Sequence, residues 1–100
     1  MMNKINRFRF YIGWNNETHK REILKATKIF NDNKVLGLSI FRDVRGVWGG
    51  VAENSFCIEV LSTTDNVLTT KTALDIKKQL EEELKQYLVI FSKEEVNLYI

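Results

Sequence analysis

The stretch FRFYIGWNN, residues Phe8–Asn16, decides the fold. From Arg7 to Gly13 the side chains alternate with the period of two residues that is typical of a β-strand. The side chains of one face are Phe8, Phe10 and Ile12. Those of the other face are Arg7, Arg9 and Tyr11. Because one face is apolar and the other is mixed, we expect a sheet that is covered on one side and open on the other.

Two amphipathic helices are expected on either side of the middle of the chain. The first begins near Asn16 or Thr18 as N-cap and ends near residues 31–33, and the second begins with Thr69 or Thr70 as its cap. The apolar stripes at helical spacing consist of Ile23, Ala26, Thr27 and Phe30 in the first helix and of Ala73, Ile76, Leu80 and Leu84 in the second.

Further strands are expected between and after the helices. Alternation over residues 36–40 and again over residues 56–60 predicts a hairpin, joined by a glycine-rich reversal that contains GVWGG, residues 46–50. The apolar run YLVIF, residues 87–91, predicts a fourth strand, and VNLYI, residues 96–100, a possible extra edge strand at the end of the chain.

The resulting order, β-α-β-β-α-β, predicts a single ferredoxin-like α+β domain over residues 1–100, with an antiparallel sheet and two helices on one face. Right-handed crossovers place the first and third strands at the centre of such a sheet. We expect function to lie on the sheet face that points away from the helices.

By alternation, this open face has a mixed polar and apolar surface. The side chains expected there are Arg7, Arg9, Tyr11, Cys57, Glu59, Leu61 and Phe41 or its neighbours, and those that could join them are Tyr87, Val89 and Phe91. A face with this much apolar area usually meets a partner or a second copy of itself, so we expect a homodimer or a protein partner.

Composition excludes several classes of protein. The 15 basic and 13 acidic side chains give a formal charge of +2, which is far from the excess that non-specific nucleic-acid binding requires. No apolar run reaches the roughly 20 residues of a membrane span, and the N-terminus lacks the apolar core of a signal peptide. With one cysteine and one histidine, we expect a cytoplasmic protein without a cofactor or metal site.

Part of the first strand resembles an RNA-recognition domain. FYIGWN is similar to the first ribonucleoprotein motif of that family, and the resemblance implies that Tyr11 stacks on a base. The third strand departs from the family, since ENSFCIEV puts Glu53 at the basic position and Ser55 and Cys57 at the stacking positions. A nucleic-acid-binding module is therefore kept only as an alternative.

A second resemblance extends over nearly the whole chain. FYIGWNN before the first helix, GLSIFRDVRGVWGG, ENSFCIEVLST and the terminal LYI are similar to a loose group of small, uncharacterised bacterial and phage proteins. The residues of this chain that carry the resemblance are Gly13, Asn15, Gly46, Trp48 and Glu53. The resemblance implies the ferredoxin-like fold and an origin in a phage or mobile element, and it implies no established activity.

The candidate partner- or ligand-binding residues are aromatic or arginine side chains at strand ends and turns: Arg9, Tyr11, Trp14, Arg42, Arg45 and Trp48. Trp48 in its glycine-rich reversal, beside Arg42 and Arg45, is suited to a binding hot spot or to stacking on a flat ligand. The alternative is that Trp48 closes one end of the core. Trp14 precedes a helix start, where free backbone N–H groups can receive an anion.

No catalytic motif is present, so we expect a non-enzymatic protein. The main hypothesis is a small phage or mobile-element accessory protein that acts by binding, with inhibition of a host defence protein such as a CRISPR effector as one form. The alternative is a protein that sequesters a nucleotide-like small molecule at a dimer interface through aromatic and arginine side chains. A third hypothesis, an enzyme that uses Cys57 or His19, has no motif to support it.

Overall fold

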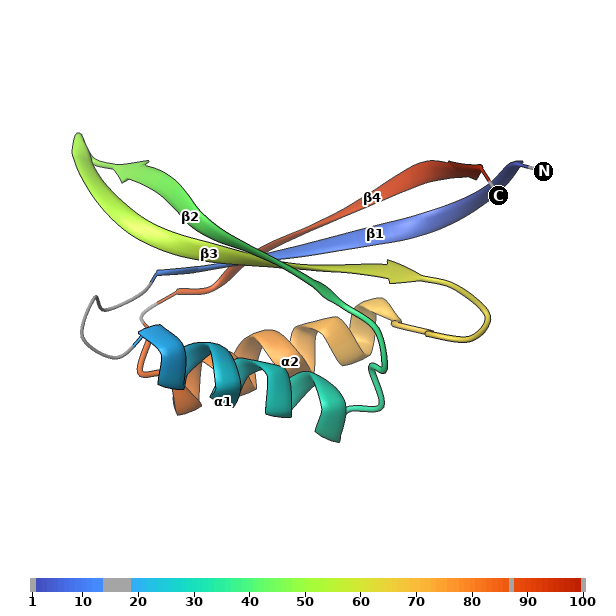
Figure 1. The fold of residues 1–100 in the computed structure, drawn as a ribbon, viewed down its shortest axis with the longest axis horizontal. Helices are drawn as coiled ribbons and strands as arrows, with labels where there is room; N and C mark the ends of the chain where they lie inside the picture. Colours follow the sequence, from blue (N-terminus) through green and yellow to red (C-terminus); the bar gives the residue numbers. More distant parts are fainter. Residues whose placement is uncertain (1, 14–18, 87, 100) are drawn as a thin grey trace.

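The computed structural model describes residues 2–13, 19–86 and 88–99, which form two helices and four strands (Figure 1). The elements in chain order are β1 (Met2–Gly13), α1 (His19–Asp32), β2 (Ser39–Trp48), β3 (Val51–Ser62), α2 (Thr70–Glu83) and β4 (Ile90–Tyr99).

The strands form one antiparallel sheet in the order β2-β3-β1-β4, and both helices cover the same face of it (Figure 1). This arrangement confirms the predicted ferredoxin-like α+β fold, with β1 and β3 at the centre. At both ends the sheet curves away from the helices: the β2–β3 hairpin rises on one side, and the end that carries both chain termini rises on the other (Figure 1). The open face lies between these two raised ends.

The core lies between the sheet and the helices, as the alternation in β1 predicts. All six residues assigned to the covered face are fully buried: Phe8, Phe10, Ile12, Phe56, Ile58 and Val60. Phe10 is central, because its ring meets Phe30 of α1 edge-to-face at 5.0 Å and stacks on Phe91 of β4 at 5.4 Å. Phe10 therefore joins a helix and an edge strand to the central strand.

Two strands extend further than their sequence patterns indicate. β1 begins at Met2, and β2 continues to Trp48, so that only Gly49 and Gly50 form the reversal, both at positive φ. A bulge between Phe41 and Val44 shifts the register of β2. It interrupts the period of two residues, which is why the sequence pattern stops there although the backbone ladder continues. The predicted start of this strand is wrong, since Leu36 lies outside it and is 79% exposed.

The C-terminal residues form one strand and not two. The polar SKEE segment lies inside β4, where it pairs with β1, so the prediction of a separate edge strand over residues 96–100 is wrong. The placement of Val89 and Phe91 on the open face is also wrong. Val89 is fully buried in the core, and Phe91 is opposite Phe10 and therefore shares its covered side. Tyr87 lies outside the described residues.

The helix boundaries agree with the predictions where they can be compared. Thr69 is the N-cap of α2, and its side chain accepts a hydrogen bond from the backbone N–H of Thr72. The two N-cap candidates for α1, Asn16 and Thr18, lie outside the described residues. None of the helices in the described part of the chain is long and apolar enough to cross a membrane. The cytoplasmic location stays a prediction.

We predict that Phe10→Ala lowers the free energy of unfolding by about 3–5 kcal/mol, because it removes both ring contacts and leaves a cavity. Urea denaturation followed by circular dichroism measures this change. The matched control is Leu24→Ala, which removes a side chain that is 71% exposed on α1 and should change stability by about 0.5 kcal/mol or less. Equal losses in the two variants would contradict the central role of Phe10.

Candidate functional site

The open face carries a row of four side chains that crosses all four strands. Phe41 of β2 is opposite Cys57 of β3, Cys57 is opposite Tyr11 of β1, and Tyr11 is opposite Ile90 of β4. Phe41 and Ile90 are 46% and 49% exposed, whereas Cys57 is 3% exposed. The row therefore offers apolar and aromatic surface to a ligand, while its thiol is shielded.

Cys57 lies on the open face as predicted, but its burial makes it a poor nucleophile. Burial raises the pKa of the Cys57 thiol, and the positive charge of Arg9 opposes this with a smaller lowering. The thiolate is therefore scarce at neutral pH. Within the described part of the chain, no group of three or more His, Cys, Asp and Glu side chains could hold a metal ion.

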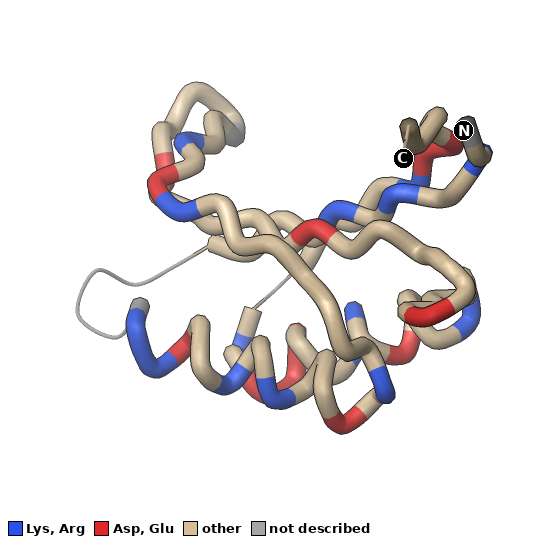
Figure 2. The backbone as a smooth tube through the Cα atoms, turned by 45° about the vertical axis from the view of Figure 1, so that its right-hand side comes forward, with Lys and Arg blue, Asp and Glu red and all other residues tan. Residues whose placement is uncertain are grey.

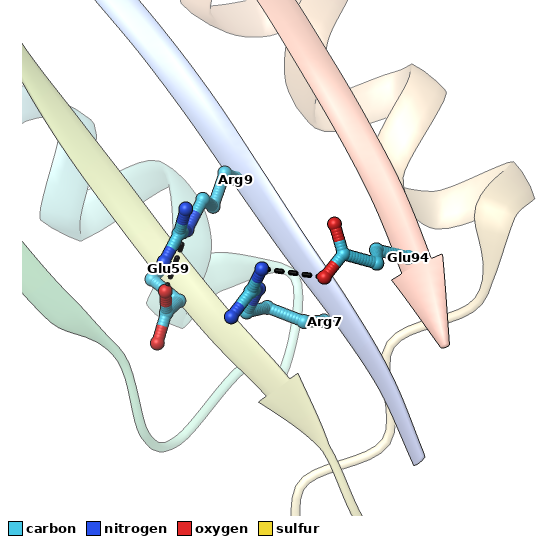
Figure 3. A network of polar contacts seen from close by, with 4 residues as sticks. All are labelled: Arg7, Arg9, Glu59 and Glu94. Carbon is cyan, nitrogen blue, oxygen red and sulfur yellow. Dashed lines mark hydrogen bonds and ion pairs between the residues drawn. The ribbon is translucent and has the colours of Figure 1, made fainter. Parts of the chain in front are cut away.

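Next to this row lies a band of ion pairs on the same face (Figure 3). Arg9 Nε donates to Glu59 Oε2 at 2.7 Å, and Arg7 Nη2 donates to Glu94 Oε1 at 2.6 Å. The Glu59 carboxylate raises the pKa of Arg9. Both arginines are thus already neutralised by carboxylates on neighbouring strands, and neither offers an uncompensated charge to a ligand.

The structure brings two of the predicted site residues together. Arg9 and Tyr11 are two residues apart on the open face of β1, and the Tyr11 hydroxyl contributes to raising the pKa of Arg9. Arg42 lies at the bulge of β2, and Arg45 pairs with Asn54 further along the hairpin; both arginines are exposed. Within one chain these four residues are therefore divided between the sheet and the hairpin, and the predicted cluster at a dimer interface stays a prediction.

Of the two tryptophans, only the backbone of Trp48 is described by the structure. Trp14 lies outside the described residues. Trp48 is the last residue of β2, and its backbone pairs with Val51, so the reversal is shorter than the predicted segment GVWGG. The role of the Trp48 ring stays a prediction. The strand continues through Gly46 because the backbone hydrogen bonds of the β2–β3 ladder continue there.

A second polar group, which the sequence did not reveal, lies where β1 ends. A Cβ atom added to Gly13 would collide with Oε1 of Glu53 and would lie 3.2 Å from Oε1 of Gln86. Glu53 is on β3, two residues from the Ser55 that pairs with Gly13, and Gln86 lies between α2 and β4. The register of the sheet brings Glu53 near Gly13, and the connection from α2 to β4 brings Gln86 there, so no spacing in the sequence could have shown that they meet.

Basic and acidic residues alternate along much of the chain. Figure 2 shows them mixed along the backbone of the helices and of the raised ends of the sheet. This pattern does not fit a nucleic-acid interface, which requires a continuous basic surface.

No protein-family model and no curated protein sequence matches the chain. Solved structures do match. A phage SAM lyase in the apo state has a TM-score of 0.74 and 22% identity, with 97% of this chain and 90% of that chain covered. The phage SAM lyase in complex with S-methyl-5′-thioadenosine has a TM-score of 0.69 and 19% identity, with 96% and 90% covered.

A nitrogen regulatory PII-like protein from Thiomonas intermedia K12, bound to ADP, AMP and bicarbonate, has a TM-score of 0.63 and 7% identity, with 100% of this chain and 98% of that chain covered. At these identities the comparisons show a shared fold. The fold thus occurs both in a phage SAM lyase and in a PII-like protein. The phage or mobile-element origin stays a prediction.

We predict that Cys57 in the folded protein reacts with Ellman's reagent at pH 8 at least about tenfold more slowly than in urea, because burial suppresses its thiolate. Phe41→Ala should increase the folded-state rate, since Phe41 is opposite Cys57. Leu74→Ala on α2, where Leu74 is 52% exposed, is the control and should leave the rate unchanged. Because folding raises the pKa of the Cys57 thiol, the free energy of unfolding should fall as the pH rises from the unfolded-state pKa of the thiol toward its folded-state pKa. A rate equal to that of the unfolded chain would contradict the shielding.

Proposed function

We propose that this protein binds a small molecule that contains adenosine and no phosphate, of the S-adenosylmethionine class, on the open face beside Tyr11. The proposal is supported by two groups of structures with the same fold whose ligands contain adenosine: S-methyl-5′-thioadenosine in the phage SAM lyase, and ADP and AMP in the PII-like protein. It develops the sequence-based alternative of a nucleotide-like ligand. The hypothesis of a host-defence inhibitor stays a prediction without support from these comparisons.

The ion pairs of the open-face arginines favour an adenosine compound without phosphate over a nucleotide. A phosphate group needs cations that are free to donate to its oxygens. Arg9 is held by Glu59 and Arg7 by Glu94, so neither guanidinium is free to neutralise a phosphate beside Tyr11. Arg42 and Arg45 are on β2 near the hairpin and not in the Tyr11 row. A ligand without phosphate needs no such cation.

Aromatic and apolar contacts supply the affinity for the base. Tyr11 and Phe41 lie on one row with Cys57 between them, so their side chains are separated by two strand spacings of about 4.8 Å each. An adenine ring can pack on such side chains with its polar edge toward water or toward the ion-pair band. Exposed Phe41 and Ile90 also fit the predicted self-association through this face, which stays a prediction.

A second candidate function is cleavage of the bound compound. It is favoured by the phage SAM lyase, whose fold covers 97% of this chain at a TM-score of 0.74. The absence of a catalytic motif favours a protein that only binds. These alternatives predict different products from S-adenosylmethionine. In cleavage the compound's own carboxylate attacks Cγ, the S–Cγ bond breaks with its electron pair left on sulfur, and S-methyl-5′-thioadenosine and homoserine lactone are released. Sequestration leaves the compound intact.

We predict that titration calorimetry detects binding of S-adenosylmethionine or S-methyl-5′-thioadenosine and weaker or undetectable binding of ADP and AMP. Tyr11→Ala should weaken binding about tenfold, since loss of stacking on a base costs about 1–3 kcal/mol. Leu74→Ala, on the helix side, is the control. No binding of any of the four compounds would refute the proposal, and tighter binding of ADP than of S-methyl-5′-thioadenosine would refute the choice of ligand type.

The same samples separate binding from cleavage. Mass spectrometry of the S-adenosylmethionine recovered after incubation should show it intact if the protein only sequesters it. Formation of S-methyl-5′-thioadenosine faster than in a protein-free control would contradict the expectation of a non-enzymatic protein and support the second candidate.

A further inference from the structure

The strongest unexplained feature of the molecule is the group of oxygen atoms at the end of β1. Glu53 Oε1 and Gln86 Oε1 both lie next to the position that a side chain at Gly13 would occupy. Across the described residues, no hydrogen bond or ion pair involves either of these two side chains. The oxygens of a carboxylate and of an amide from different segments thus converge on one glycine.

Gly13 and Glu53 of this group belong to the open face, within reach of a ligand at Tyr11. Gly13 is two residues beyond Tyr11, and residues i and i+2 of a strand point to the same face about 6.6 Å apart. Glu53 is two residues from Ser55 and four from Cys57, so strand alternation assigns all three to one face. A compound whose base packs on Tyr11 can therefore place a substituent beside Glu53.

The electrostatics of the group differ from those of the ion-pair band. Glu59 and Glu94 are neutralised by Arg9 and Arg7, whereas the Glu53 carboxylate forms none of the ion pairs in the described part of the chain. The absence of a side chain at Gly13 leaves the room that the Glu53 carboxylate occupies. A carboxylate beside an amide oxygen attracts a positively charged group and repels an anion.

We propose that Glu53, with Gln86 and Gly13, forms the subsite for the positively charged part of the ligand, the sulfonium or ammonium group of a compound of the S-adenosylmethionine class. This inference rests on the proposed function and adds a specificity-determining residue to it. Glu53 distinguishes cationic adenosine compounds from uncharged and phosphorylated ones. Tyr11 binds the adenine base that all of these compounds share.

The test compares the affinities of S-adenosylmethionine, which is cationic at sulfur, and of uncharged S-methyl-5′-thioadenosine, in the wild type and in Glu53→Gln. We expect the variant to bind S-adenosylmethionine about five- to tenfold more weakly and S-methyl-5′-thioadenosine within about twofold of the wild type. The control is Glu82→Gln, which removes the same charge from an exposed position on α2 and should leave both affinities unchanged.

A second variant tests the geometry with the charge retained. Gly13→Ala places a methyl group where Glu53 Oε1 lies, and the flexible carboxylate must move aside. Gly13 is not among the glycines at positive φ, so the variant should melt no lower than the wild type. It should still lose affinity for S-adenosylmethionine by about threefold or more if the subsite depends on this arrangement.

The outcomes separate this inference from the proposed function. If the wild type binds neither compound, both are refuted. If both compounds bind and Glu53→Gln weakens them equally, or weakens neither, the subsite is refuted and the proposed function stands. A selective loss for S-adenosylmethionine in Glu53→Gln, absent in Glu82→Gln, supports the subsite.

Discussion

The structure depends on the difference in polarity between the two faces of β1. Its apolar face, with Phe8, Phe10 and Ile12, is fully buried. The ring of Phe10 contacts both the ring of Phe30 in α1 and the ring of Phe91 in β4. Since alternate residues of a strand point to opposite faces, burial of this side forces Arg7, Arg9 and Tyr11 onto the open face. The position of the core thus determines which side chains are available to a ligand.

The chemistry of the open face follows from cross-strand pairing. Neighbouring strands place Glu59 beside Arg9 and Glu94 beside Arg7, and these pairs remove the positive charge that the β1 sequence suggests when it is considered alone. What remains is an aromatic and apolar row, a neutral band and, at the end of β1, the unneutralised Glu53 carboxylate. This combination of surfaces suits a neutral or cationic compound better than a nucleotide or a nucleic acid.

The comparisons illustrate that a fold does not determine a function. The same arrangement of strands and helices occurs in a phage SAM lyase and in a nitrogen regulatory PII-like protein, and identities of 7–22% show no more than that shared arrangement. The choice among the functions therefore has to come from side chains. In this chain the ion pairs of Arg7 and Arg9 and the position of Glu53 supply that argument.

The sequence by itself determined the order of elements, the central positions of β1 and β3 and the six core residues of these strands, because periodicity is a local property that each segment carries alone. It also placed Arg9, Tyr11, Cys57 and Glu59 on one face. Only the tertiary structure decided the rest. The bulge in β2 and the single strand β4 that turns Phe91 inward depend on strand register. The meeting of Gly13, Glu53 and Gln86 depends on register and on the path of the chain from α2 to β4. Register is fixed by hydrogen bonds between segments that are distant in the chain, so no local pattern records it.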